Sequence, residues 1–304
     1  MEKFDIHILG CGSALPTTRH QATSQVINIR EKLFMIDCGE GTQVQLRRSR
    51  QRFNRLNHIF ISHLHGDHCF GLIGLISTFG MLERTADLHI HCHPELEKLL
   101  MPQLDFFCKG MSYQVIFHPF NPGEQTIIYD DRSVSVETIP LRHRIPTCGF
   151  LFKEKPTPNH ILREMIDFYK IPTYMINRIK NGEDYTTEEG VVIPNSRLTT
   201  PSSPPRSYAY CSDTMYLPRI VPQIQGVDLL FHEATFANTE LARAKQTMHS
   251  TAQQAAQIAQ AAQVKKLMIG HFSARYEDEN ALLKEASSIF PQTILAQENL
   301  RISL

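Results

Sequence analysis

The sequence predicts an α/β fold in which two β-sheets pack against each other between layers of helices. Short runs of β-branched and apolar residues, bounded by turn-forming residues, recur through the first half, and helical patterns lie between and after them. The chain has 304 residues, of which 42% are apolar and 20% charged, so it can bury a sizeable core and is neither disordered nor fibrous. We expect one domain over 1–304, although a single α/β sheet fits the same pattern of elements.

The expected strands are apolar runs that end near Gly, Pro, Asn or Asp. They cover 4–9, 25–29, 33–37, 57–62, 87–91 and 133–139. The expected helices cover 69–82, 250–262 and 279–289, and the second is rich in Ala and Gln and starts with a Ser/Thr cap. Two rounds of strands with covering helices indicate the two-sheet arrangement.

The segment 153–206 interrupts this alternation of predicted strands and helices. It contains a predicted helix at 159–169, the turn-forming pair Asn181-Gly182 and the run TTPSSPPRS, which cannot hold regular structure. We interpret it as a projecting insertion within the domain, which either binds a partner or is a surface excursion without function.

Net charge and cysteine content narrow the class of protein. Thirty-one Lys and Arg residues balance thirty-one Asp and Glu residues, so any contact with a polyanion must come from local clusters. The seven cysteines are scattered and include no CxxC pair, which argues against a disulfide framework and a thiolate zinc site. The N-terminus lacks a secretion signal, and the longest apolar stretch, 69–82, is too short to span a bilayer. We therefore expect a soluble, cytoplasmic protein.

The strongest signal is SHLHGDH at 62–68, in a chain that has fifteen histidines. It follows the apolar run HIFI, so a strand is expected to end in a tight turn that contains glycine. Such a turn can bring together three imidazoles and one carboxylate, those of His63, His65, His68 and Asp67. These N and O ligands suit zinc. A surface cluster is the alternative, but histidines this close repel each other once protonated.

A metal site here needs ligands from other segments, because the side chains of one short turn cannot surround an ion. Three residues at the ends of predicted strands are candidates: His143 in IPLRHRIP, Asp213 in AYCSDT and His271 in LMIGHFS. Loops at strand ends commonly gather functional residues in layered α/β folds. Taken alone, each of the three could also be an ordinary loop residue.

Further motifs accompany these residues and identify a family. SHLHGDH occurs together with GCGSALPTTRHQATS and DCGEGTQVQ upstream and with HEATF, MHSTAQQAA and IGHFSARY downstream. The set resembles the metallo-β-lactamase superfamily and, more narrowly, the ribonuclease Z family of tRNA 3′-processing endonucleases, over nearly the whole chain. HEATF, HST and HFSARY together are specific to the tRNA-processing branch.

The resemblance implies an αββα metallo-β-lactamase sandwich in which 153–206 is an arm that grips tRNA. It implies two zinc ions per chain, the first bound by His63, His65 and His143, the second by Asp67, His68 and His271, with Asp213 as a bridge. Two ions held in this way can activate water and clamp a phosphodiester. The implied enzyme is a cytoplasmic, homodimeric endoribonuclease that removes the 3′ trailer from precursor tRNA, leaving a 3′-hydroxyl on the tRNA and a 5′-phosphate on the trailer.

The same resemblance implies roles for residues outside the ligand set. Glu233 and His249 match the family's pair that protonates the leaving ribose oxygen, a role suited to an imidazole oriented by a carboxylate. Asp67 could orient the attacking water in addition to binding metal. From the residues alone, His249 could instead be an ordinary residue at a helix N-terminus, and His232 could lie in the core.

Basic residues that could bind RNA phosphates fall in three places. Five arginines lie within nine residues before the metal motif: Arg47, Arg48, Arg50, Arg52 and Arg55. Arg275 lies four residues after His271, and the insertion carries Lys170, Arg178 and Lys180. An arginine run is otherwise typical of a solvated helix face. The insertion also lacks the Gly-Pro pair typical of the arm tip in bacterial members of the family.

Other functions fit parts of the sequence. A small-molecule zinc phosphodiesterase would share the ligands without needing the insertion or the arginines. A thioester or lactone hydrolase would not need Glu233 and His249. A metal-free RNA-binding or dimerisation scaffold is disfavoured by the intact set of seven candidate ligands.

Overall fold

The computed structural model describes residues 2–15 and 17–304, and their contacts divide the chain into two units. One unit comprises Glu2–Lys153 and Arg206–Leu304, and the other comprises Glu154–Pro205. Among the described residues, no helix is long and apolar enough to cross a membrane.

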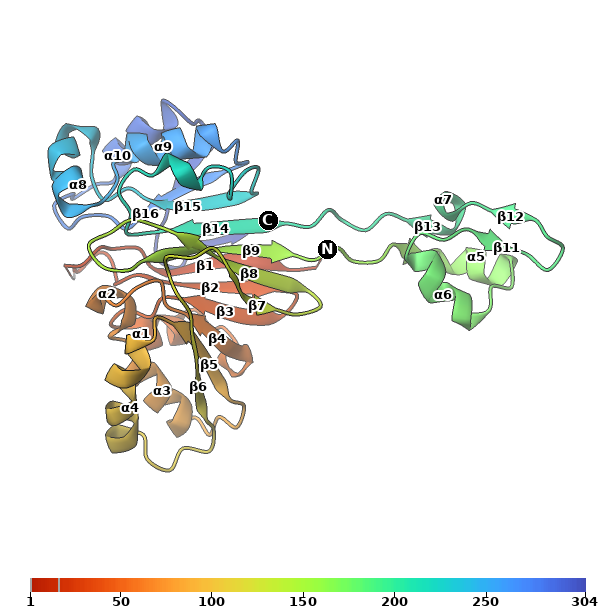
Figure 1. Ribbon diagram of the computed structural model, residues 1–304, viewed down its shortest axis with the longest axis horizontal. Coiled ribbons are helices and arrows are strands. Elements are labelled where there is room, and N and C mark those ends of the chain that lie inside the picture. The colour runs from red at the N-terminus through yellow and green to blue at the C-terminus, as the bar shows by residue number, and fades with distance from the viewer. Residues whose placement is uncertain (1, 16) are drawn as a thin grey trace. The chain divides into compact units, whose positions relative to one another are not determined.

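The first sheet of the larger unit has the strand order β18-β1-β2-β3-β4-β5-β6 (Figure 1). Its strands are β1 (Phe4–Gly10), β2 (Ser24–Ile29), β3 (Lys32–Ile36), β4 (Leu56–Phe60), β5 (Leu88–Cys92), β6 (Val115–Pro119) and β18 (Arg301–Ser303). β3 to β6 run parallel, whereas β1 pairs antiparallel with both β2 and β18. A strand from the far end of the chain therefore covers the edge of β1.

The second sheet has the strand order β17-β16-β15-β14-β9-β8-β7. Its strands are β7 (Ile127–Asp130), β8 (Val134–Pro140), β9 (Cys148–Glu154), β14 (Ser207–Cys211), β15 (Leu229–Glu233), β16 (Leu267–Gly270) and β17 (Thr293–Leu295). β14 to β17 run parallel, and β9 is antiparallel to β14. Parallel strands place their carboxyl ends at one edge of a sheet, where the loops that follow them can form a site.

Helices cover the outer face of each sheet, so the larger unit is an αββα sandwich (Figure 1). α1 (Thr42–Arg48), α3 (Leu72–Met81) and α4 (Glu95–Phe107) pack on the first sheet, and α9 (Ala252–Ala261) and α10 (Asn280–Ser287) pack on the second. In β3, Phe34 and Ile36 join the core between the sheets, while Leu33 and Met35 join the core under the helices. Both faces of the strand are therefore apolar, and the predicted fold class is confirmed.

Some helices differ from their sequence-based prediction. The helix expected at 69–82 is α3, but it begins only at Leu72, because Cys69 ends a separate short helix, α2 (Gly66–Cys69), and Phe70 and Gly71 lie between the two. A Cβ on Gly71 would lie 2.0 Å from the carbonyl oxygen of Gly39, so the backbone packs there at a distance that only glycine allows. α4 has no counterpart among the expected helices because it contains Pro102, a residue that usually ends a helix. Shorter elements are α8 (Leu241–Thr247) and 3₁₀ turns at Phe53–Arg55, Pro218–Ile220 and Asn238–Glu240.

The smaller unit, Glu154–Pro205, is built from short elements around its own core. β10 (His160–Ile161) pairs with β13 (Thr199–Thr200), and β11 (Tyr185–Thr186) pairs with β12 (Val192–Ile193). Its helices are α5 (Arg163–Phe168), α6 (Thr173–Lys180) and α7 (Asn195–Leu198). The helix predicted at 159–169 is wrong in its first residues, and the start of TTPSSPPRS is a strand, because the two segments pair with each other. Residues 201–206 are irregular, as expected.

Candidate metal centre

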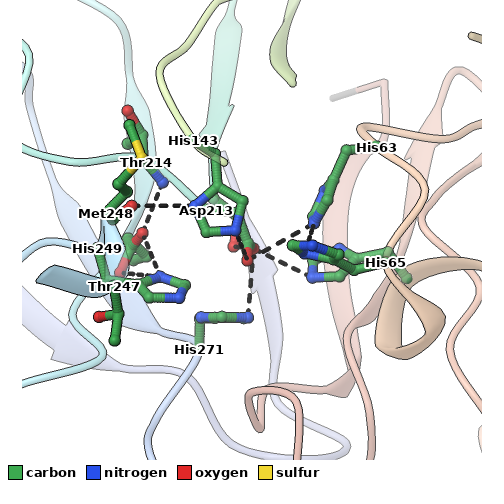
Figure 2. A network of polar contacts seen from close by, with 12 residues as sticks. His63, His65, His143, Asp213, Thr214, Thr247, Met248, His249 and His271 are labelled. Carbon is green, nitrogen blue, oxygen red and sulfur yellow. Dashed lines mark hydrogen bonds and ion pairs between the residues drawn. The ribbon is translucent and has the colours of Figure 1, made fainter. Parts of the chain in front are cut away.

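The seven predicted ligands lie together at the ends of strands from both sheets. They are His63 and His65 after β4, Asp67 and His68 on α2, His143 after β8, Asp213 after β14 and His271 after β16. Asp213 and His271 have φ values of 56° and 60°, in the left-handed region that is uncommon for residues other than glycine. Each therefore leaves its strand through a sharp turn, and both side chains face the centre (Figure 2).

Asp213 lies between the donors contributed by the other segments (Figure 2). Its Oδ1 lies 3.6 Å from Nε2 of His63 and 3.8 Å from Nε2 of His143. Its Oδ2 lies 3.0 Å from Nε2 of His68 and 3.2 Å from Nε2 of His271. The two oxygens thus face different histidines, as a carboxylate that bridges two metal ions does.

The donors form two groups, in each of which the candidate ligand atoms lie within 4.8 Å of one another. The first group is His63, His65 and His143 with Asp213, and the second is Asp67, His68 and His271. In the first, Nε2 of His63 lies 3.0 Å from Nδ1 of His65. In the second, Oδ2 of Asp67 lies 3.3 Å from Nε2 of His68 and 3.6 Å from Nε2 of His271.

Hydrogen bonds on the far side of four imidazoles determine which nitrogen faces the centre. In each of these rings Nδ1 is engaged with an oxygen, so Nε2 is left for a metal. The partners are Ser62 Oγ for His63 (3.0 Å), Asp37 Oδ2 for His68 (2.8 Å), the Met248 carbonyl for His143 (3.0 Å) and Thr235 Oγ1 for His271 (3.0 Å). The rings are therefore held in place before any ion binds.

Asp37 is fully buried and supports this centre. No role for it is predicted from the sequence. It follows β3, and its carboxylate accepts hydrogen bonds from the amide and the hydroxyl of Ser62 at 2.8 and 2.9 Å. It also accepts from Nδ1 of His68 at 2.8 Å and from the hydroxyl of Tyr210, on β14 of the other sheet, at 2.8 Å. Its signal in the sequence is the carboxylate of DCGEG at the end of a predicted strand.

The protonation chemistry of the centre fits a divalent metal ion. Burial lowers the pKa of His63, and the neighbouring His68 lowers it further, so the lone pair of this imidazole is available. Burial alone would raise the pKa of Asp213, but the surrounding histidines outweigh it and hold that pKa well below its usual range. Nε2 of His68, of His143 and of His271 is buried and lacks a hydrogen bond to any described residue. A cation would satisfy these nitrogens, and the donor set suits zinc and similar metals.

Glu233 and His249 form a hydrogen-bonded pair beside the ligands. Glu233 is the last residue of β15 and is fully buried, and its Oε1 lies 3.0 Å from Nδ1 of His249. Burial alone would lower the pKa of His249, but Glu233 outweighs it and raises the pKa to about 9. The His249 ring lies 4.8 Å from that of His143 and 5.4 Å from that of His271. His249 also has a nitrogen within 4.8 Å of donor atoms of Asp213 and His271, so the geometry alone permits it to be a ligand as well as an acid.

His232 lies in the core rather than in the centre. Its side chain is fully buried, and its Nδ1 donates to the carbonyl of the next residue, Glu233, at 2.8 Å. Burial lowers its pKa, so the ring is neutral. The structure therefore favours the core position for this residue.

The centre opens into a cavity of about 880 Å³. Besides ligands and His249, its lining includes Phe70, Arg144, Arg243 and Arg275. Arg275 donates to Oε2 of Glu240 at 2.6 Å, and its guanidinium lies 5.0 Å from the ring centre of Phe236. Arg144 and Arg243 are exposed and form no ion pair with any described residue. Arg144 directly follows His143 in IPLRHRIP, which is its signal in the sequence, whereas Arg243 lies in no motif and emerges only from the structure.

The other predicted RNA contacts are not among the residues that line this cavity. Arg47, Arg48, Arg50, Arg52 and Arg55 are exposed in the last turn of α1 and the segment after it. Arg55 donates to Oε2 of Glu31 at 2.6 Å. Lys170, Arg178 and Lys180 belong to the smaller unit, where Arg178 donates to Oε2 of Glu183 at 2.7 Å.

Known sequences match the chain over its whole length. It is 73% identical to ribonuclease Z from Phocaeicola vulgatus, covering 100% of this chain and 98% of the relative. It is 72% identical to ribonuclease Z from Bacteroides thetaiotaomicron, covering 100% of this chain and 96% of the relative. A family model described as "Anti-Pycsar protein Apyc1" matches residues 4–156, so this half of the chain also belongs with that family.

Solved structures match the fold. The crystal structure of the short form of human tRNase Z matches with a TM-score of 0.70 at 25% identity, over 98% of both chains. The metallo-β-lactamase fold protein YhfI from Bacillus subtilis matches with a TM-score of 0.69 at 15% identity over 100% of both chains, which is a likeness of fold alone. With the relatives that match it from end to end, the chain belongs to the ribonuclease Z family, metal-dependent tRNA 3′-processing endoribonucleases of the metallo-β-lactamase superfamily.

Proposed function

We propose that this chain cuts the 3′ trailer from precursor tRNA with two zinc ions, leaving a 3′-hydroxyl on the tRNA and a 5′-phosphate on the trailer. The observation that supports two ions is the position of Asp213, whose two oxygens face different donor groups. The first ion would be held by His63, His65 and His143 and the second by Asp67, His68 and His271, with Asp213 between them. Such a pair of ions activates water and neutralises charge on the phosphodiester.

Asp67 would orient the attacking water in addition to binding metal. It lines the cavity, and its Oδ2 faces both His68 and His271. Burial alone would raise its pKa, but these two histidines hold it well below its usual range. The carboxylate is therefore ionised and accepts a hydrogen bond from water.

His249 would protonate the ribose oxygen that leaves with the tRNA. With its pKa near 9, the ring carries a proton at neutral pH, and it lines the cavity that holds the ligands. Glu233 also accepts hydrogen bonds from the amides of Thr214 and Ser250, at 2.6 and 3.1 Å. These bonds fix the carboxylate, which in turn fixes the imidazole that donates the proton.

RNA phosphates would be bound by three groups of basic residues. Arg144, Arg243 and Arg275 line the cavity and suit the phosphates nearest the cut. The exposed arginines 47–55 would contact the substrate beyond the cavity. Within the single domain 1–304, the smaller unit would be the substrate-binding arm, with Lys170, Arg178 and Lys180 on or next to α6.

An exposed apolar surface on α3 and α4 supports a homodimer. Met81, Leu99, Phe106 and Phe107 are all more than half exposed, and the last two rings contact each other at 4.8 Å. Apolar surface of this kind commonly marks a protein interface. Light scattering should show a dimer that Phe106→Asp converts to a monomer.

All seven cysteines are free, which supports the reducing cytoplasm as the compartment.

Cleavage of a labelled precursor tRNA tests the proposed activity. The purified protein should cut at the 3′ end of the mature tRNA, with the stated end groups, and a chelator should abolish cleavage until metal is restored. Elemental analysis should find about two metal ions per chain. Hydrolysis of small phosphodiesters without cleavage of the RNA would instead favour a small-molecule phosphodiesterase, and full activity with one ion would exclude the two-metal centre.

A further inference from the structure

We propose that Phe70 is a stacking platform for an unpaired nucleobase next to the scissile phosphate. The inference rests on the proposed cleavage of RNA, and it assigns a base-binding site to a residue that no sequence motif marked. The ligand class is a single-stranded nucleotide of any base.

Phe70 is an exposed aromatic ring in the wall of the metal cavity. It directly follows α2, which carries Asp67 and His68, and it lines the same cavity as Asp67. Its side chain is 70% exposed, whereas Phe236, another phenylalanine of the lining, is 4% exposed. The core therefore gains little from the Phe70 ring, and the ring is free to bind a ligand.

Gly66 gives the ring a fixed support. A Cβ on Gly66 would lie between 2.3 and 2.7 Å from three carbons of the Phe70 ring, so the ring packs directly on the Gly66 backbone. The Phe70 amide also donates to the Gly66 carbonyl at 2.9 Å, which fixes the main chain beneath the ring. A ring supported in this way loses little conformational freedom when a base stacks on it.

An unpaired base is the ligand that fits an exposed ring in this setting. Every base has an apolar face that stacks on aromatic side chains, and sites for single-stranded nucleic acid combine such rings with cations that follow the backbone. Arg144 and Arg243 supply those cations in the same cavity, and Leu15 adds a second exposed apolar side chain to the lining. Because the metal ligands occupy this cavity, a base on Phe70 belongs to a nucleotide that flanks the bond to be cut.

A cycle that combines a protein change with an RNA change tests the platform. The substrates are intact precursor tRNA and two versions with an abasic ribose, one at each nucleotide that flanks the scissile bond. Phe70→Leu should raise KM for the intact substrate by roughly 5- to 100-fold, the effect of one lost stack, with a smaller effect on kcat. At the stacked position, the abasic substrate should show a similar loss with the wild-type protein and no further loss with Phe70→Leu. Phe70→Tyr keeps the ring and should restore most of the KM.

Three results would overturn the platform. The first is an unchanged KM for Phe70→Leu. The second is that the losses caused by Phe70→Leu and by the abasic ribose add at both positions. The third is a loss of metal or of thermal stability in Phe70→Leu, which would explain its defect by damage to α2. If the wild-type protein leaves intact precursor tRNA uncut, the proposed function fails and the platform fails with it. That outcome is distinguishable, because it requires no comparison between variants.

Discussion

Asp37 and Ser62 lie behind the cavity lining, yet they set the direction of the imidazoles of His68 and His63. At the scale of residues, the meeting of the seven proposed ligands is predictable because each stands in a short motif at a strand end. Asp37 also stands in a motif at a strand end, but its supporting role is not predictable, because its partners Ser62 and Tyr210 lie 25 and 173 residues away in sequence. The same holds for Arg243, which lies in no motif and reaches the cavity only through the fold, whereas Arg144 is the direct sequence neighbour of His143.

Asp37→Asn tests this supporting role. The amide keeps the volume of the carboxylate but removes its charge from Nδ1 of His68, so the ring is held less firmly. We expect metal affinity to fall by roughly 10- to 100-fold, the usual effect of removing a partner behind a metal ligand. Competition with a chelator measures the affinity. Wild-type affinity in the variant would show that Asp37 serves only the packing of the two sheets.

His249→Ala separates an acid from a ligand. We expect unchanged metal content and a fall in turnover on RNA of about two to four orders of magnitude, the range for losing a general acid. A nitrophenyl phosphodiester has a leaving group that needs little protonation, so the variant should lose much less activity on it. Loss of metal, or equal loss on both substrates, would make His249 a ligand or a structural support, as its distance to Asp213 and His271 permits.

At the scale of elements, strands β4, β5 and β6 carry a cluster of four histidines that the metal centre does not use: His58, His89, His91 and His118. The rings of His58 and His89 stack at 4.8 Å, and those of His91 and His118 stack at 4.7 Å. Nδ1 of His58 lies 3.2 Å from Nε2 of His91. Burial is the main cause and the neighbouring histidines add to it, and together they lower the pKa of His58 to about 4 and that of His91 to about 2. The folded protein therefore keeps the rings of His58 and His91 neutral.

This cluster predicts acid sensitivity of the first sheet. Below the usual histidine pKa of about 6.5, the unfolded chain binds protons that the folded cluster does not bind. The free energy of unfolding therefore falls as the pH falls from about 6.5 to about 4. Each ring that stays neutral in the folded protein changes the free energy of unfolding by at most ~1.4 kcal/mol per pH unit. Urea unfolding at several pH values measures the free energy of unfolding as a function of pH. Its decrease per pH unit should be smaller for His91→Gln than for wild type. His160→Gln, at an exposed residue of the smaller unit, is the control, and an equal slope in all three proteins would refute the prediction.

Elements are predictable where a local pattern dominates and not where a distant partner decides. α9 begins as expected because Thr251 and Gln254 form a reciprocal capping pair within one turn. The pairing of β10 with β13 joins segments about forty residues apart, and no local signal indicates it.

At the scale of the whole molecule, the contacts separate a sandwich that holds the metal ligands from the smaller unit, Glu154–Pro205. The interruption of the strand rhythm predicts an insertion at 153–206, but its small core of Ile171, Ile179 and Leu198 could not be foreseen from irregular, proline-rich sequence. The insertion holds none of the seven ligands and neither member of the Glu233–His249 pair. In the proposed function, substrate binding by the smaller unit would therefore be separate from the chemistry, which would take place in the sandwich.

Replacing Glu154–Pro205 with a short Gly/Ser linker tests this assignment. We expect weaker cleavage of precursor tRNA, mainly through a higher KM, and little change in hydrolysis of a nitrophenyl phosphodiester, because the ligands lie in the other unit. Changing Lys170, Arg178 and Lys180 to Ser in the full chain is the matched variant and should reproduce part of the defect. Equal loss on both substrates would mean that the unit supports the structure of the sandwich.

The pairing of β1 with β18 determines when the sandwich can be completed during protein synthesis. Asp5 lies opposite Ser303, so the edge of β1 stays open on the nascent chain until β18 has been made. His271, on the segment after β16, also arrives late, and the second donor group is incomplete without it. The strand pairs of the smaller unit, in contrast, lie entirely within Glu154–Pro205 and can form earlier. The nascent chain can therefore fold the smaller unit while the second donor group still lacks His271, and in the proposed two-metal enzyme metal uptake would be one of the last events of maturation.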